Sequence, residues 1–123
     1  MTENEITKII LKCAFIVHTA LGPGLLESSY QACLAYELKQ HGLLAETEKP
    51  MPLVYKEVNL DVGYRLDLIV ENKVIVEIKT VEAFTDINIS QLLTYLRLSN
   101  CKVGLLLNFR VASLKHGIKR VML

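Results

Sequence analysis

The sequence has few cysteines, and their arrangement excludes the usual metal and disulfide frameworks. Cys13, Cys33 and Cys101 are odd in number, widely spaced and set within apolar patterns, with no CxxC pair and no Cys/His cluster. Zinc sites and disulfide-stapled folds depend on such pairs and clusters. We therefore expect three buried thiols in a reducing compartment.

Long apolar runs are also missing. The longest stretch without a charged residue, residues 13–26, contains a histidine, two glycines and a proline. It is too short and too polar to cross a bilayer. The start of the sequence, residues 1–5, is acidic and polar, which is unlike a secretory signal. The sequence therefore predicts a cytoplasmic protein with no membrane partner.

Low-complexity segments and linkers are absent as well. The chain has 123 residues, of which 51% are hydrophobic and 22% charged. This composition is typical of a globular chain with enough apolar material for a core. The length suits one domain, so residues 1–123 are expected to form a single unit.

The net charge of +1 conceals an asymmetry along the chain. Residues 1–96 carry 8 Lys/Arg and 13 Asp/Glu, whereas residues 97–123 carry no acid. The cations of that last segment are Arg97, Lys102, Arg110, Lys115, Lys119 and Arg120. A basic end beside an acidic site suits a polyanion held near a bound metal. An ordinary solvated surface explains the same charges equally well.

Hydrophobic periodicity predicts an α/β fold, a mixed sheet of about four strands flanked by helices. Apolar residues at helical spacing indicate helices over about 4–21, 25–40 and 86–98. A period of two indicates strands over 46–60 (one or two, at a sheet edge because of Pro50 and Pro52), 62–70, 74–80, 103–109 and 118–123. Gly104, within one of these strands, predicts close packing.

The hairpin of strands 62–70 and 74–80 is the candidate site. Side chains alternate between faces, so Val62, Tyr64, Leu66, Leu68 and Val70 are expected on one face, and Asp67 on the other with Gly63, Arg65 and Ile69. With Val70 opposite Val74, Asp67 faces Glu77 and Arg65 faces Lys79. Directly opposed side chains have Cβ atoms about 4.5–5.5 Å apart.

Two opposed carboxylates repel each other unless a cation lies between them. Mg²⁺ fits, because it binds a few carboxylate oxygens and keeps water and phosphate as its other ligands. Lys79 is predicted to project toward the same place, where it would orient the attacking water and offset transition-state charge. The alternative is a solvated face with the ion pairs Asp67–Lys79 and Arg65–Glu77. Ile69 and Ile75, which share that face, argue against it.

Asp67, followed ten positions later by Glu77-Ile78-Lys79 on a hairpin, resembles the D…(D/E)xK motif of the PD-(D/E)XK nucleases. The stretch 24–30, Gly-Leu-Leu-Glu-Ser-Ser-Tyr, looks like the signature of the GxxExxY proteins of that superfamily. Residues 21–24, 91–96 and 103–109 resemble these proteins too, so the similarity covers nearly the whole chain. Leu66 replaces the proline in the name of the motif, as in many superfamily members.

The resemblance implies a metal-dependent nuclease acting on nucleic acid, with DNA as the expected substrate. It implies that Asp67, Glu77 and the backbone carbonyl of Ile78 hold Mg²⁺, or Mn²⁺ in its place, and that Lys79 positions the water. Glu27 would support the metal or its water. An alternative is a catalytically silent module with the same fold that binds nucleic acid or protein. The small chain also suggests a homodimer or a partner protein.

The remaining candidates each have a structural interpretation beside the functional one. Glu27 also suits the first turn of a helix, where a carboxylate is favoured. Tyr30, a candidate for orienting substrate, is expected to support Glu27 or to pack. Gln91 and Tyr95 share a helix face and resemble the QxxxY motif that orients the site in related exonucleases; they also suit a polar-aromatic boundary. His18 near a helix end is expected to be structural.

Overall fold

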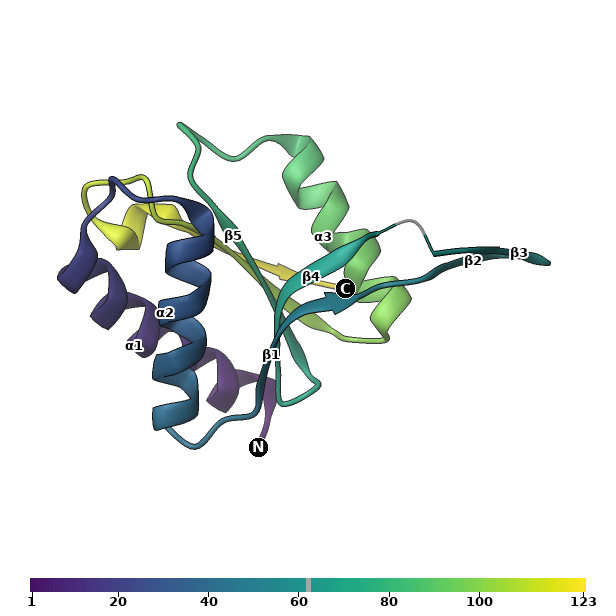
Figure 1. Ribbon diagram of the computed structural model, residues 1–123, viewed down its shortest axis with the longest axis horizontal. Helices are drawn as coiled ribbons and strands as arrows, with labels where there is room; N and C mark the ends of the chain where they lie inside the picture. Colours follow the sequence, from purple (N-terminus) through teal and green to yellow (C-terminus); the bar gives the residue numbers. More distant parts are fainter. Residues whose placement is uncertain (62) are drawn as a thin grey trace.

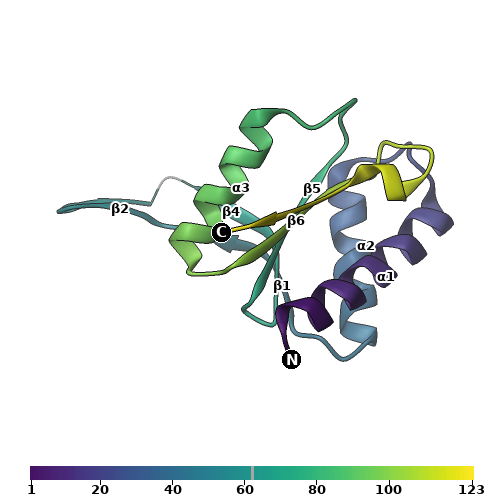
Figure 2. The same cartoon turned by 180° about the vertical axis from the view of Figure 1, so that it is seen from behind.

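The computed structural model describes residues 1–61 and 63–123, so Val62, predicted to begin a strand, lies outside the described residues. The elements form three layers around a central sheet (Figure 1). Helices α1 (Glu3–Leu21) and α2 (Glu27–Gln40) cover one face of the sheet, and α3 (Asp86–Ser99) covers the other. Figure 2 shows the same layers from behind.

The central sheet is mixed and has five strands in the order β1-β4-β5-β6-β7. These strands are β1 (Ala45–Pro50), β4 (Arg65–Val70), β5 (Val74–Lys79), β6 (Val103–Asn108) and β7 (Ile118–Met122). β5 and β6 are parallel and are joined through α3, whereas the other neighbours are antiparallel. The predicted α/β class is therefore confirmed. The predicted number of about four strands is too low, because the C-terminal segment adds β7 as a full edge strand.

The segment predicted as one or two strands over 46–60 forms three. β1 is an edge strand, as Pro50 within it and Pro52 just after it suggest. The chain then forms a separate hairpin of β2 (Leu53–Tyr55) and β3 (Val58–Leu60). This hairpin projects well beyond the sheet (Figure 1). The strand predicted over 62–70 begins later, at Arg65.

Helix ends follow the sequence signals closely. The Thr2 side chain accepts a hydrogen bond from the Glu5 amide at the start of α1, and Gly22, with φ of 70°, ends the helix. Thr85 and Asn88 form a reciprocal capping box at the start of α3. Within residues 1–61 and 63–123, none of the helices has the length and apolar character that crossing a bilayer requires.

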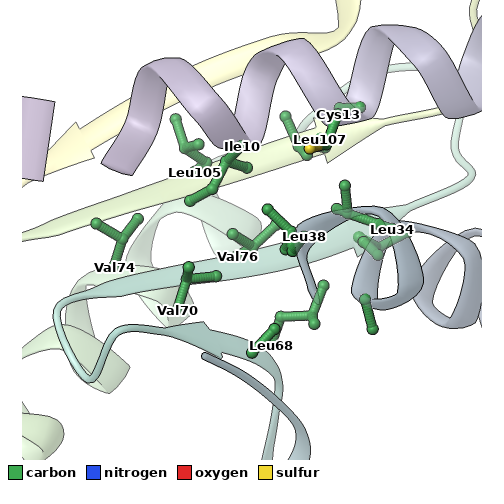
Figure 3. Packing of buried hydrophobic residues seen from close by; sticks show 14 of the residues in the cluster. Ile10, Cys13, Leu34, Leu38, Leu68, Val70, Val74, Val76, Leu105 and Leu107 are labelled. Atoms are coloured by element: carbon green, nitrogen blue, oxygen red, sulfur yellow. The ribbon is translucent and has the colours of Figure 1, made fainter. Parts of the chain in front are cut away.

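Apolar side chains are buried on both faces of the sheet. On one face, residues of β4, β5 and β6 pack against α1 and α2, as Figure 3 shows for Ile10, Leu38, Val76 and Leu105. On the other face, Ile75 of β5 and Leu106 of β6 pack in one cluster with Leu92 and Leu96 of α3. The strands of the site are therefore fixed from both sides.

The packing of α3 on β6 depends on Gly104. A Cβ atom at Gly104 would lie 2.8 Å from Leu92 Cδ1. We expect Gly104→Ala to lower the free energy of unfolding by about 1–3 kcal/mol, because the added methyl overpacks this contact. Denaturant unfolding measures the change.

Gly24→Ala is the matched control. A Cβ atom there meets no atom within 4 Å, so its effect should stay within about 0.5 kcal/mol. Adding Leu92→Ala to Gly104→Ala should cost less than Leu92→Ala costs alone. Equal unfolding midpoints for Gly104→Ala and Gly24→Ala would contradict the close contact between Gly104 and Leu92.

Candidate metal and phosphate site at the β4–β5 gap

The backbone pairing between β4 and β5 stops in the middle of both strands. The paired residues are Val70–Val74, Ile69–Ile75 and Leu68–Val76, as the predicted register requires. Beyond Leu68, β4 stays with β1 while β5 stays with β6, and the two strands separate (Figure 1). The predicted pairing of Arg65 with Lys79 is therefore wrong, because β4 and β5 have separated before Arg65, which keeps only its pairing with Pro50 of β1.

The first residues beyond the pairing are Asp67 and Glu77, and their side chains replace the lost ladder. The Asp67 amide donates a hydrogen bond of 2.9 Å to Glu77 Oε2. The Ile78 amide donates one of 2.8 Å to Asp67 Oδ2. Each carboxylate thus bonds the facing strand, and both lie where the gap between the strands opens.

The alternation of faces also breaks at this point. Leu68 and Val70 are buried on the α1–α2 side, but Leu66 is buried on the α3 side. The prediction that Leu66 shares a face with Leu68 is wrong, because the pairing of β1 with β4 passes over one residue of each strand. The residues passed over are Asp67 and Glu48, and Glu48 has a φ of 50°, which few non-glycine residues adopt.

Glu48 was not identified from the sequence, yet its charge acts on both carboxylates of the gap, raising the pKa of each. Nothing in its local sequence distinguishes it from the other exposed acids. The signal is structural: a left-handed residue inside a strand, next to the site.

The site is covered rather than solvated. Glu77 is 5% exposed. Among residues 1–61 and 63–123, the only ion pair within 4 Å joins Glu46 to Lys49 on β1. The alternative with pairs Asp67–Lys79 and Arg65–Glu77 on a solvated face is therefore wrong.

Burial and like charge shift both carboxyl groups in the same direction. Burial, reinforced by the negative charge of Asp67, raises the pKa of Glu77 to about 8. Burial also raises the pKa of Asp67, with smaller contributions from the charges of Glu48 and Glu27. The Lys79 charge and the two amide hydrogen bonds act in the opposite direction. The gap therefore favours a proton, or another cation, on its acids.

Glu27 lies in the first turn of α2, exposed, and close enough for its charge to act on Asp67. Tyr30 is fully buried and stacks on Phe109 with ring centroids 4.5 Å apart. Its hydroxyl accepts from the Leu25 amide and donates to the Gly22 carbonyl. Because this bonding occupies the hydroxyl, Tyr30 can influence substrate only by holding the loop before Glu27.

Gln91 and Tyr95 are neighbours on α3, as their spacing predicts. Gln91 Nε2 donates to the Tyr95 hydroxyl over 3.2 Å. Burial, followed by the charges of Glu77 and Asp67, raises the pKa of Tyr95. Tyr95 also belongs to the α3-side core with Leu66 and Ile69, which flank and follow Asp67 on β4.

Two further buried polar residues have structural roles. Asn108, not predicted as a site residue, pairs with Lys79 on the neighbouring strand. Its amide side chain bonds the Val81 backbone twice, at 2.8 and 3.2 Å, and accepts from the Arg110 amide at 3.1 Å. It thus holds both chain segments that leave the site. A buried amide at the end of an apolar strand is a signal that could have identified it. His18, as expected, is structural, with Nε2 bonded to the Val111 carbonyl at 2.8 Å.

Three cations of the basic C-terminal segment lie near the gap. Arg110 and Lys115 follow the carboxyl end of β6, which lies beside the carboxyl end of β5. Lys119 pairs with Leu106, and Leu106 pairs with Glu77. The side chains of Lys119 and Glu77 therefore project from the same face of the sheet. Two strand spacings separate Lys119 from Glu77, or about 10 Å.

Arg97 and Lys102 lie toward the opposite end of β6, whereas Arg120 pairs with Leu105 in the middle of β6 and projects from the other face of the sheet. Arg97 is in the last turn of α3, just before β6. Lys102 and Arg120 line a common cavity with Asn4, and Arg120 donates to Asn4 Oδ1 over 2.6 Å. A six-residue strand spans roughly 20 Å. The basic segment predicted beside the site is therefore divided, and only half of it is placed to meet a substrate there.

The oxygen donors of the gap fit a hard divalent cation. The amide hydrogen bonds use one oxygen of Asp67 and one of Glu77, and the Ile78 carbonyl belongs to the same strand segment. In the described ranges, no group of three or more His, Cys, Asp or Glu side chains is arranged to hold a metal ion. Mg²⁺ needs only one or two carboxylates, because water and phosphate complete its octahedron.

Comparison with known proteins adds one finding. The family model described as the PD-(D/E)XK nuclease superfamily matches residues 4–121, which extend from α1 to β7 and include every element around the gap. No curated protein and no solved structure matches the chain.

The raised pKa of Glu77 makes stability depend on pH in the metal-free protein. Between about pH 4.5 and about pH 8 the folded state holds a proton on Glu77 that the unfolded state has lost. Stability should therefore fall as the pH rises through this range and level off above it. Melting temperatures measured in a chelator from about pH 5 to about pH 9 test this.

Glu77→Gln should remove most of this dependence, because the amide cannot ionise, and should melt above the wild type at about pH 9. Glu57→Gln, exposed in the turn between β2 and β3, is the control and should keep the wild-type profile. A wild-type stability that rises with pH over this range would contradict the assignment.

Proposed function

The chain belongs to the PD-(D/E)XK nuclease superfamily, and we propose that it is a metal-dependent nuclease that hydrolyses phosphodiester bonds of nucleic acid, with DNA as the substrate and Mg²⁺ as the metal. In this proposal residues 1–123 act as one nuclease-like domain. The motif at residues 24–30 supports the further proposal that the chain is one of the GxxExxY proteins.

One observation carries the proposal: the reciprocal bonding of two acids across a gap between strands. Asp67 and Glu77 are held there by each other's strands, over 2.8 and 2.9 Å, although burial and like charge oppose their ionisation. Buried acids with raised pKa values are typical of functional sites. A divalent cation between the two acids would offset their repulsion, which supports a metal site.

The site residues then have distinct roles. Asp67, Glu77 and the Ile78 carbonyl would hold Mg²⁺, or Mn²⁺ in its place, and the ion would supply Lewis-acid stabilisation of the phosphate. Glu27, at the start of α2, would accept hydrogen bonds from water bound near the metal. Glu77 must lose its proton before it can serve as a ligand.

Lys79 is the residue we assign to the chemistry. Lys79 follows Glu77 by two positions on β5, so the two side chains project from the same face of the sheet. In the folded protein its charge lowers the pKa of both acids, which supports a role beside them. There it can orient the attacking water and offset the charge that develops on the phosphate oxygens.

Gln91 and Tyr95 would orient the groups around the scissile phosphate from the α3 side. Arg110, Lys115 and Lys119 would contact phosphates on either side of it, because phosphate contacts supply most of the affinity for nucleic acid. Because one small chain covers little of a nucleic acid, a second copy or a partner protein would bind the same substrate beside it.

We expect Lys79→Ala to lower Mg²⁺-dependent cleavage by at least about a hundredfold, because the variant lacks the group that acts on the water and the transition state. The fold should persist, since the Lys79 side chain is half-buried and has no ion pair among the described residues. Cleavage of labelled single- and double-stranded DNA and RNA, with and without Mg²⁺, measures the loss.

Lys102→Ala is the matched control. Lys102 is exposed at the far end of β6, so cleavage by this variant should equal that of the wild type. Normal cleavage by Lys79→Ala would displace the catalytic assignment. If the wild type cleaves none of the four substrates with Mg²⁺ or Mn²⁺, the protein is a silent module and the proposal fails.

A further inference from the structure

A cavity of about 170 Å³ lies beside the site, between α3 and the base of the β2–β3 hairpin. It is lined by Leu53, Tyr64, Gln91, Thr94, Tyr95 and Leu98. Leu53 is the first residue of the projecting hairpin, and Tyr64 lies just before β4 (Figure 1). The cavity is therefore bounded by the segments that lead into and out of the hairpin.

Tyr95 connects this cavity to the gap between β4 and β5. It lines the cavity, is 6% exposed, and packs in the α3-side core with Leu66 and Ile69, the residues next to and near Asp67. The charges of both acids reach its hydroxyl. A ligand that enters the cavity is thus held next to the proposed metal site.

The lining has the chemistry of a base-binding pocket. Tyr64 and Tyr95 offer two aromatic rings, and Tyr64 is 45% exposed, so it is available for stacking. The Gln91 amide, which uses one N–H on the Tyr95 hydroxyl, can bond the polar edge of a base with its other groups. Leu53 and Leu98 contribute apolar walls. Unpaired bases are recognised by aromatic stacking together with hydrogen bonds to their exposed edges.

A larger cavity of the molecule lacks these features. It measures about 290 Å³ and lies between α1 and α2, on the opposite face of the sheet, where its lining is almost wholly apolar. Tyr36 is the one aromatic residue that lines it. The cavity beside Tyr95, in contrast, combines two aromatic rings with polar groups and shares Tyr95 with the core beneath the acids.

We propose that this cavity binds an unpaired nucleobase of the substrate, next to the phosphodiester in the gap. The site therefore prefers single-stranded nucleic acid, or a strand with a base displaced from its stack, over an intact duplex. Within a duplex the faces of a base are stacked on its neighbours, so the base must leave the helix to enter. This inference rests on the proposed function and adds the class of substrate.

Binding without cleavage tests the proposal directly. The probe is a fluorescent oligothymidylate of about twelve nucleotides, compared with an abasic oligomer of equal length, by anisotropy in a chelator. The wild type should bind the oligothymidylate at least about tenfold more tightly than the abasic oligomer. Tyr64→Ala should lose about tenfold for the oligothymidylate, because base stacking is lost, and little for the abasic oligomer.

Two variants act as controls. Tyr64→Phe keeps the ring and should bind like the wild type. Tyr36→Ala removes a tyrosine that is 61% exposed on α2, away from the cavity, and should also leave binding unchanged. Melting temperatures equal to that of the wild type would show that the variants are folded.

The outcomes separate this inference from the proposed function. If Tyr64→Ala binds the oligothymidylate like the wild type, or if the wild type prefers the duplex of the same length, the base pocket is refuted even when Mg²⁺-dependent cleavage is present. If base-dependent binding through Tyr64 is observed but no substrate is cleaved, the pocket is supported and the nuclease proposal alone fails. A loss by Tyr36→Ala equal to that by Tyr64→Ala would also overturn the pocket.

Discussion

The site depends on two hydrogen bonds that cross between strands: the Ile78 amide to Asp67 Oδ2, and the Asp67 amide to Glu77 Oε2. They replace the backbone ladder where β4 and β5 part, and so they satisfy amides that the gap would otherwise leave unpaired. The same bonds hold each carboxylate in the opening. If one acid is lost, an amide loses its partner and the other acid loses part of its support, so the pair acts as a unit.

This arrangement is costly in the absence of a cation. Two acids are brought together, one of them 5% exposed, and burial with like charge raises the pKa of Glu77 to about 8. Near neutral pH the metal-free site therefore retains a proton on Glu77. A divalent ion would replace that proton, and would convert an unfavourable concentration of charge into a set of ligands. The two acids thus account both for the proposed metal binding and for the unfavourable charge in the metal-free gap.

Sequence periodicity predicted the elements well because apolar residues line both faces of the sheet. It also predicted the register of Val70 with Val74, since the three-residue turn fixes the pairing. It failed where the pairing is irregular. The face of Leu66 and the role of Glu48 follow from a left-handed residue in β1, which no local pattern marks. The predicted pairing of Arg65 with Lys79 is wrong because β4 separates from β5 before Arg65 and stays paired with β1. The basic segment is divided by the length of β6, which separates Arg97 and Lys102 from the gap, and by the two faces of β7, which separate Arg120 from Lys119.

The central claim is that a divalent metal replaces the Glu77 proton in the gap. Calorimetric titration with Mg²⁺ at about pH 7, in two buffers of different ionisation enthalpy, measures both binding and proton release. The account predicts binding with release of roughly one proton, because Glu77 with a pKa of about 8 must ionise, and no such release in Glu77→Gln. Absence of binding, or binding with no proton released from the wild type, would contradict it.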